Sequence, residues 1–198
     1  MGDINNDNYD DLIVSSTMFN NYTGRVLIFL GGNPMNAEYD FVLNGSKNYS
    51  GFGSSVSTAG DVNAVGISDF LVASSIDYNL QIDTSKVFLY LGSTDLDTIP
   101  DLIYYSPYIE DSFGSSIASA GDINSDGFDD LFFVELSAPR YDSSSSYVIF
   151  GKSDFADEVD FPGTPGNDIL TGTSAAESFE GGDGNDRMIG RGGSDELH

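Results

Sequence analysis

The feature that most constrains this chain is a unit that occurs three times within its first 155 residues. Gly-Asp followed by a loop of acidic and amide residues begins at Gly2, Gly60 and Gly121, roughly every 60 residues. After each loop come the same segments in the same order: a short apolar run, a polar loop, and a second apolar run closed by glycine. Such a repeat dictates the architecture, because each copy forms one unit that must pack on its neighbours.

The apolar runs are short, rich in Val, Ile, Phe and Tyr, and bounded by Gly, Ser, Asn and Asp, which is typical of β-strands. They are residues 11–16, 69–74 and 130–135 for the first run, and residues 25–30, 86–91 and 147–150 for the second. Glycine-rich segments at residues 51–56 and 112–117 precede the second and third acidic loops. No segment favours a helix, so we expect about four strands in each unit. The sequence therefore predicts an all-β chain that begins with a partial β-propeller of about two and a half four-stranded blades.

Each acidic loop carries oxygen-bearing side chains at alternate positions, counted from the aspartate of Gly-Asp as position 1. The predicted ligands are Asp3, Asn5, Asp7 and Asp11 in the first loop, Asp61, Asn63 and Asp69 in the second, and Asp122, Asn124, Asp126 and Asp130 in the third. The main-chain carbonyls of Tyr9 and Phe128, at position 7, are predicted to add one oxygen each. This spacing, with a sharp turn at position 6, is typical of loops that wrap Ca²⁺. The alternative is an ordinary set of Asx turns.

The three loops differ at two positions that matter for the calcium pattern. Position 6 is Gly127 in the third loop and Asn8 in the first, and Asn tolerates left-handed backbone geometry. Position 5 is an acid in the first and third loops but Val65 in the second. We therefore expect the second calcium site to be weak or empty.

The pattern Phe-Gly…Gly-Asp-x-Asn-x-Asp-Gly-x-x-Asp-Leu, found in full in the third copy, resembles the FG-GAP repeat of the integrin α-subunit type of propeller. The same repeat occurs in secreted bacterial proteins, and the resemblance covers residues 1–155. It implies that the calcium ions brace the blades and perform no chemistry. Propellers close with about 4 to 8 blades. We therefore expect a piece of a longer protein, in which the remaining blades are partners of this chain.

The composition and the period change after Phe161. Four nonapeptides follow, at residues 163–171, 172–180, 181–189 and 190–198. The third, GGDGNDRMI, fits the Gly-Gly-x-Gly-x-Asp-x-apolar-x repeat of the calcium-binding β-helix of RTX proteins. Position 6 is held by the predicted calcium ligands Asp168, Asp186 and Asp195. The alternative is a flexible linker.

The resemblance to RTX repeats implies a short parallel β-roll at residues 163–198, joined to the propeller repeats by a linker at residues 156–162. Turns on one side of such a coil belong to repeats n and n+2, so Asp168 and Asp186 are expected to share an ion. Glu177 would pair with Asp195, but Ala175 and Ala176 replace turn residues of the second repeat and leave that site open. The resemblance also implies a bacterial protein exported by a type I machine that reads a C-terminal signal, and no such signal is visible.

The composition excludes several function classes. The chain holds 32 Asp and Glu against 7 Lys and Arg, a net charge of -25, which repels nucleic acids and anionic lipids but suits calcium. Cysteine is absent, so thiolate chemistry has no candidate residue. The single histidine is the terminal residue, His198, and a frayed chain end is a poor place for the base of a Ser-His-Asp triad. No stretch approaches the roughly 18 apolar residues of a membrane span, and no signal peptide follows Met1.

The sequence therefore predicts a non-enzymatic, secreted calcium-binding module with a structural or adhesive role, ordered by Ca²⁺ after export. Its expected ligand is a surface, a matrix or another protein. Two alternatives stay open: an accessory part of a secreted hydrolase of polysaccharide or lipid, or a module that serves only folding and secretion. Extracellular modules bind Ca²⁺ at about 10⁻⁴ to 10⁻³ M, so cytosolic calcium would leave such sites empty.

Overall fold

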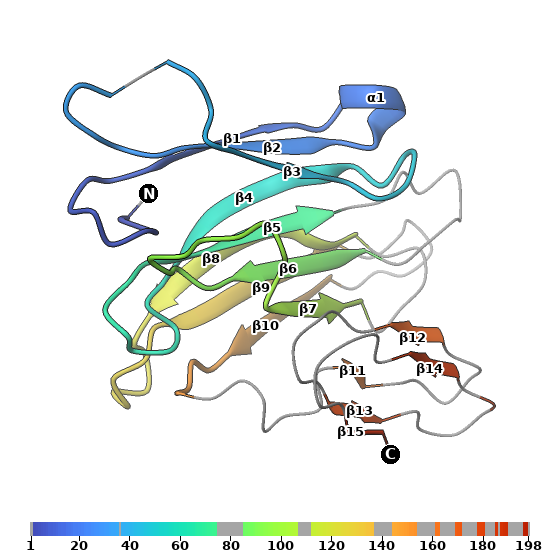
Figure 1. Cartoon of the computed structure of the whole chain (residues 1–198). Coiled ribbons are helices and arrows are strands. Elements are labelled where there is room, and N and C mark those ends of the chain that lie inside the picture. The colour runs from blue at the N-terminus through green and yellow to red at the C-terminus, as the bar shows by residue number, and fades with distance from the viewer. Residues whose placement is uncertain are drawn as a thin grey trace.

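The computed structural model of the chain describes residues 2–35, 37–74, 85–106, 112–136 and 144–153, with the short stretches 161–162, 169–171, 178–180, 185, 187–189 and 196–197. Over these residues the structure is nearly all β, as the sequence predicts. Three antiparallel sheets, one for each repeat, stand side by side like the blades of a propeller (Figure 1). The fold is that of a partial β-propeller.

The strands follow the predicted runs closely. The first sheet has the order β1-β2-β3, with β1 at Leu12–Ser16, β2 at Arg25–Phe29 and β3 at Phe41–Asn44. The second has the order β4-β5-β6-β7, with β4 at Phe52–Gly60, β5 at Asp69–Ser74, β6 at Lys86–Tyr90 and β7 at Leu102–Tyr105. The third has the order β10-β9-β8, with β8 at Ser112–Gly121, β9 at Asp130–Leu136 and β10 at Ser144–Ile149. Strand β10 begins earlier than the predicted run.

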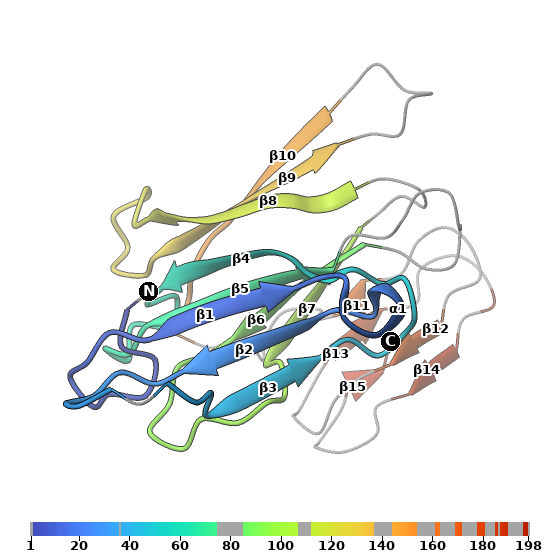
Figure 2. The same cartoon turned by 90° about the horizontal axis from the view of Figure 1, so that it is seen from above.

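The expectation of no helix is wrong for one turn. Helix α1, at Phe19–Tyr22, lies in the connection between β1 and β2 (Figure 2). Its residues Asn20 and Asn21 have φ values of 47° and 56°, so it is not a regular right-handed helix. Asparagine adopts left-handed geometry more readily than most residues, which allows a turn of this kind in a polar connection.

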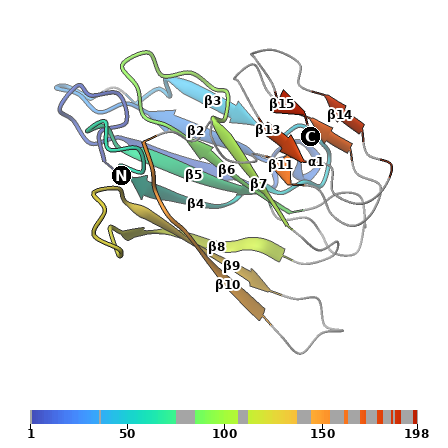
Figure 3. The same ribbon diagram turned by 90° about the horizontal axis from the view of Figure 1, so that it is seen from below.

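Two apolar cores lie between the three sheets, which follow one another in Figures 2 and 3. Between the first and second sheets lie Ile4, Ile13, Val26, Ile28, Leu43, Phe52, Phe70, Val72 and Tyr90. Between the second and third lie Ala59, Val62, Leu71, Ala73, Val87, Leu89, Leu102, Phe113, Ile117, Leu131 and Phe133. The cores hold the sheets face to face and so fix the position of the loops at their ends.

Strand β5 shows why its segment is apolar at consecutive positions. Phe70 and Val72 belong to the core on one side of the strand, and Leu71 and Ala73 belong to the core on the other. All residues of β5 are buried. A strand covered on both faces needs apolar residues in succession, whereas a half-exposed strand needs them only at alternate positions.

From residue 161 onwards the described residues form five short strands, of which the first lies in the predicted linker and the other four lie in the nonapeptides. They are β11 at Phe161–Pro162, β12 at Ile169–Thr171, β13 at Ser178–Glu180, β14 at Arg187–Ile189 and β15 at Glu196–Leu197. All pair in parallel, in the orders β11-β13-β15 and β12-β14. Leu170 lies opposite Met188, which is the n to n+2 register expected of a coil of nonapeptides. Leu170 is also buried against Tyr105 of β7, so this region packs beside the second sheet.

Most of the turns of the nonapeptides, including the predicted ligands Asp168, Asp186 and Asp195, lie outside the described residues. The same holds for Glu177 and for most of the predicted linker. The complete β-roll and the domain boundaries therefore stay predictions.

The fold predicts that Gly114 of β8 is needed for the close approach of the third sheet to the second. Its φ is +73°, and an added Cβ would lie 2.6 Å from Val87 Cγ2 and 3.1 Å from Ala73 Cβ. Gly121 is a matched control, because its φ is +65° but no atom lies within 4 Å of an added Cβ. We expect Gly114→Ala to lower the free energy of unfolding by about 2 to 4 kcal/mol, and Gly121→Ala by about 1 kcal/mol. Urea denaturation at constant calcium measures both, and equal losses would contradict the packing role.

Candidate calcium sites

The three acidic loops occupy equivalent places in the fold. The first leads into β1, the second joins β4 to β5, and the third joins β8 to β9. All three lie at the same end of the sheets, on the left in Figure 1. The repeat in the sequence has thus become a row of acidic loops along one end of the propeller.

The loops share one backbone conformation. Positions 4 and 6 are left-handed in every copy: Asn6 and Asn8 with φ of 61° and 70°, Ala64 and Gly66 with 55° and 86°, and Ser125 and Gly127 with 63° and 97°. The sequence analysis anticipated this geometry at position 6. It did not anticipate position 4, where the three copies carry three different residue types.

The carboxylate at position 1 organises each loop. Asp122 Oδ1 accepts a hydrogen bond from the N–H of Asp126 at 3.0 Å, and its Oδ2 accepts one from the N–H of Gly127 at 3.0 Å. Asp3 and Asp61 accept the equivalent bonds in their loops. These are Asx-type bonds, which stabilise the turn from its own side chain.

The amide oxygen at position 3 comes close to the carboxylate at position 1. The N–H of Asp126 donates both to Asp122 Oδ1 and to Asn124 Oδ1, each at 3.0 Å. The first and second loops repeat this shared donor with Asn5 and Asn63. Two hard oxygen atoms therefore converge in every loop, so the Asx geometry and a calcium site are compatible.

Position 5 separates the second loop from the other two. The Oδ1 atoms of Asp7 and Asp126 accept from the N–H of Tyr9 and Phe128, at 2.9 Å and 3.0 Å. Val65 offers no oxygen, yet its loop keeps the left-handed residues and the bonds to Asp61. The acid at position 5 is therefore not needed for the backbone shape of the loop; without it the second loop lacks a potential ligand and the hydrogen bond to position 7.

The aspartates at position 9 have a role that the sequence analysis missed. Asp69 is fully buried; its Oδ2 accepts from the N–H of Val62 and its Oδ1 from the N–H of Gly92, both at 2.7 Å. Asp11 and Asp130, also buried, accept the equivalent pairs from Ile4 and Gly31 and from Ile123 and Gly151. Each of these carboxylates joins position 2 of the loop to the glycine that closes the second apolar run. The fixed recurrence of that glycine was the signal in the sequence.

The closing glycines lie against the loops so tightly that no side chain fits. A Cβ on Gly92 would lie 2.3 Å from the carbonyl oxygen of Ser68, and one on Gly151 would lie 2.4 Å from that of Asp129. Both contacts are with main-chain atoms, which cannot turn aside as a flexible side chain can. The closing glycine is therefore part of the same structural unit as the acidic loop.

Neighbouring loops are hydrogen-bonded to one another. The N–H of Ser68 donates to the carbonyl of Asp3 at 3.0 Å, and the N–H of Asp129 donates to the carbonyl of Asp61 at 3.1 Å. The Asp129 carboxylate also accepts from the N–H of Asp61 at 2.9 Å. The three loops thus form a continuous row that crosses both boundaries between sheets.

The electrostatics of the row favour a bound cation. Desolvation by burial raises the pKa of Asp11 and raises the pKa of Asp69 to about 7, although backbone N–H donors act in the opposite direction. Repulsion from Asp7 and Asp3 raises the pKa of Asp11 further. Carboxylates that repel one another in a loop are relieved by a divalent ion.

The donor set of the first and third loops fits Ca²⁺, because all its predicted ligands are oxygens from carboxylates, an amide and a carbonyl. The second loop fits less well without an acid at Val65. Within the described part of the chain, no group of three or more Asp, Glu or His side chains is arranged to hold a metal ion by itself. The individual ligands therefore stay predictions.

Comparison with known protein families matches both repeat types. Residues 1–29 match the FG-GAP repeat, and residues 162–197 match four copies of the RTX calcium-binding nonapeptide repeat. The chain carries FG-GAP and RTX repeats. Both kinds of repeat bind Ca²⁺, so calcium is the cofactor of this chain.

The chain is similar to integrin α subunits over about two thirds of its length. It is 30% identical to integrin alpha-IIb of Mus musculus over 150 residues, which are 70% of this chain and 14% of that protein. It is 27% identical to integrin alpha-5 of Xenopus laevis over 142 residues, 65% of this chain and 13% of that protein. Integrin alpha-4 of Xenopus laevis is 35% identical over 120 residues, 60% of this chain and 11% of that protein. The chain thus spans only about one eighth of the length of these relatives.

Together these findings indicate a module built from calcium-binding repeats. Among the described residues, no helix has the length and the apolar character needed to cross a membrane.

An acid in place of Val65 is predicted to add calcium binding to the second loop. Because the second loop already has the shape of the other two, Val65→Asp supplies the missing ligand without rebuilding the backbone; the side chain is 59% exposed, so no core is disturbed. We expect isothermal calorimetry to detect one more bound Ca²⁺ than in the wild type. Val65→Ala is the control and adds none, whereas Asp126→Ala removes one from the third loop. An unchanged stoichiometry in Val65→Asp would show that the second loop is no calcium site.

Substitution of Asp69 is predicted to lower the stability of the fold. This loss does not come from lost calcium, because the calcium site of the second loop is the one expected to be weak or empty. Asp69→Ala leaves two buried N–H groups without an acceptor, and we expect the free energy of unfolding to fall by about 3 kcal/mol. Asp61→Ala, in the same loop, frees only the exposed N–H groups of Val65 and Gly66, which water can bind, and is expected to cost less than about 1 kcal/mol. Urea denaturation compares the two, and equal costs would refute the bridging role of Asp69.

Proposed function

We propose that this chain is a non-enzymatic structural and adhesion module of a secreted bacterial protein, ordered by calcium after export. The observation that carries the proposal is the row of three acidic loops, joined to each other by hydrogen bonds and placed at one end of three packed sheets. The RTX match at residues 162–197 supports export, and the integrin similarity supports adhesion.

Calcium acts on folding in this proposal. The chain carries a net charge of -25, and its loops bring carboxylates together that repel one another in the absence of a cation. The free energy of calcium binding therefore adds to the free energy of folding. Millimolar calcium outside the cell fills sites of this type and the low calcium of the cytosol does not. The chain stays loose before export and becomes ordered afterwards.

The contact surface that we propose for a protein ligand is an aromatic cluster at the opposite end of the first sheet from its acidic loop (Figure 1). It consists of Met18, Phe19, Tyr22 and Tyr49, which are 40% to 73% exposed. Tyr22 stacks on Tyr49 with ring centroids 6.0 Å apart, and the Arg25 guanidinium lies 4.1 Å from the centre of the Phe19 ring.

Main-chain hydrogen bonds between the β1–β2 connection and the β3–β4 connection hold the cluster in shape. The N–H of Tyr49 donates to the carbonyl oxygen of Asn21 at 3.0 Å, and the N–H of Gly51 donates to the carbonyl oxygen of Tyr22 at 2.9 Å. Exposed Tyr and Met side chains on a fixed backbone are typical of the centres of protein interfaces. This supports a role in recognition for the end of the propeller that does not carry the acidic loops.

The test is binding of the full chain to immobilised extracellular-matrix extract, measured by surface plasmon resonance at about 1 mM calcium and in EDTA. We expect binding in calcium only, and an affinity about tenfold lower for Tyr22→Ser, because interface aromatics carry much of the binding energy. Tyr39→Ser is the matched control, since Tyr39 is 53% exposed and lies outside the cluster. Binding that persists unchanged in EDTA would contradict the proposal. Hydrolysis of a polysaccharide or lipid by the chain would favour the hydrolase alternative.

A further inference from the structure

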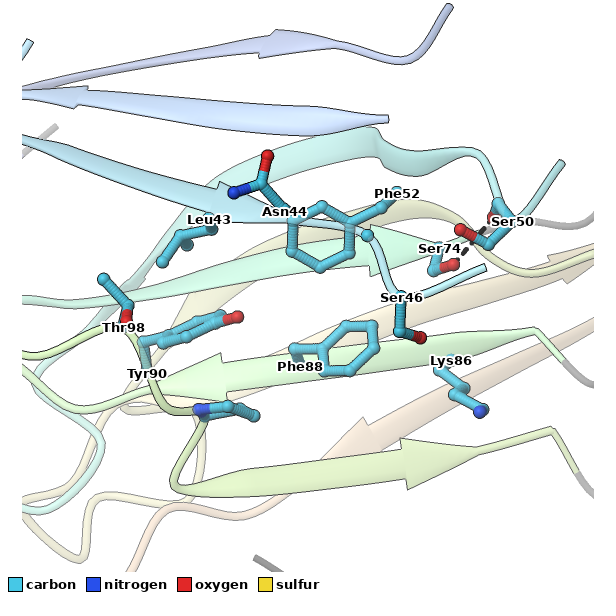
Figure 4. Close-up of a pocket in the computed structure, with 12 residues that line it drawn as sticks. Leu43, Asn44, Ser46, Ser50, Phe52, Ser74, Lys86, Phe88, Tyr90 and Thr98 are labelled. Atoms are coloured by element: carbon cyan, nitrogen blue, oxygen red, sulfur yellow. Dashed lines mark hydrogen bonds between the residues drawn. The ribbon is translucent and has the colours of Figure 1, made fainter. Parts of the chain in front are cut away.

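A cavity of about 150 Å³ lies between the first and second sheets. Figure 4 shows the aromatic rings of Phe52, Phe88 and Tyr90 gathered in it, with polar residues from both sheets around them. None of the residues that line the cavity belongs to an acidic loop. The cavity is therefore a feature separate from the calcium sites.

Tyr90 offers a hydroxyl group to an occupant of the cavity. Its side chain is only 4% exposed and its ring stacks on Phe70, with centroids 4.7 Å apart. Its hydroxyl makes no hydrogen bond to a described residue and points among the residues that line the cavity (Figure 4). The hydroxyl oxygen is therefore reached from the cavity, and a hydrogen-bonding group of an occupant can pair with it.

The rim offers further neutral polar groups. Asn44, Ser46 and Thr98 are among the residues that line the cavity, with the Asn44 amide on the outer side of β3 (Figure 4). The hydroxyl of Ser74, by contrast, is already engaged with the carbonyl of Ser50 at 2.7 Å (Figure 4). Hydroxyl and amide groups above aromatic rings can bind a ligand that has a polar edge and an apolar face.

The charges around the cavity oppose one another. Lys86 lines it, with its Nζ 5.2 Å from the centre of the Tyr105 ring. Asp101 and Asp97 lie near enough to Tyr90 for their negative charges to raise the pKa of its hydroxyl, in addition to the larger effect of burial. A cation that lines the cavity and two carboxylates near Tyr90 together disfavour a strongly charged occupant of either sign.

We propose that this cavity binds one neutral sugar ring, such as a hexose unit of a glycan. A pyranose has C–H groups that pack on aromatic rings and hydroxyl groups at its edge that pair with Tyr90, Ser46 and Thr98. A cavity of about 150 Å³ accommodates one six-membered ring. This site goes beyond the proposed function and does not depend on it, because no calcium ligand takes part.

The test uses saturation-transfer NMR and titration of the full chain, loaded with calcium, with the methyl glycosides of glucose, galactose and mannose and with methyl glucuronide. We expect a Kd on the order of 1 mM for at least one neutral glycoside, which is typical of a ligand of this size, and weaker binding of the glucuronide. Tyr90→Phe keeps the ring and its stacking and removes only the hydroxyl. It is expected to weaken binding roughly fivefold with no loss of stability, because that hydroxyl has no protein partner to lose.

Two further variants make the result specific. Tyr104→Phe is the matched control, since it removes a buried tyrosine hydroxyl from the same sheet outside the cavity, and binding should not change. Thr98→Tyr places a larger side chain on the rim at an exposed position and should abolish binding without unfolding the chain. Retained calcium stoichiometry in both confirms that the calcium sites are intact.

Three results would overturn the inference. They are no saturation transfer to any glycoside at about 10 mM, wild-type affinity in Tyr90→Phe, or tighter binding of the glucuronide than of the neutral sugars, which would indicate an anion site at Lys86. If the chain binds a sugar but shows no calcium-dependent adhesion, the proposed function is refuted and this inference stands.

Discussion

The structure depends on a buried aspartate that accepts two main-chain hydrogen bonds. In each repeat this carboxylate joins the start of the acidic loop to the glycine at the end of the second apolar run, as Asp69 does for Val62 and Gly92. The two oxygens replace acceptors that water would otherwise supply to buried N–H groups. The loop, the two strands and the closing glycine are thereby fixed to one another. The same bridge in all three copies explains why the repeats keep one shape although their loops differ in sequence.

Because the shape of each loop is fixed by these hydrogen bonds, it does not depend on whether the loop carries every predicted calcium ligand. The second loop has the backbone of the other two but carries Val65 in place of an acid. Because the loops are hydrogen-bonded in a row, through Asp3 to Ser68 and Asp61 to Asp129, a change in one loop reaches its neighbour through main-chain contacts. In the proposed function, calcium bound in this row would act on the arrangement of whole sheets.

The packing of the sheets explains how much of the fold could be predicted. The run at residues 69–74 indicated a strand correctly, and the structure buries that strand, because β5 has a core on each side. The same type of run at residues 11–16 forms β1, where Leu12 and Val14 are 49% and 42% exposed. The two runs look alike in sequence, and only the position of the neighbouring sheet decides which apolar side chains are covered.

The sequence by itself determined the repeat, the strands and the acidic spacing, because these depend on neighbouring residues: alternation of side chains, turn residues and oxygen atoms at fixed intervals. The bridging role of Asp69 and the cavity around Tyr90 were decided only by the tertiary structure. Both bring together residues that are far apart in the chain, such as Asn44, Tyr90 and Thr98 from two different sheets. No local pattern encodes such a meeting, because it follows from the angle and distance at which whole sheets pack.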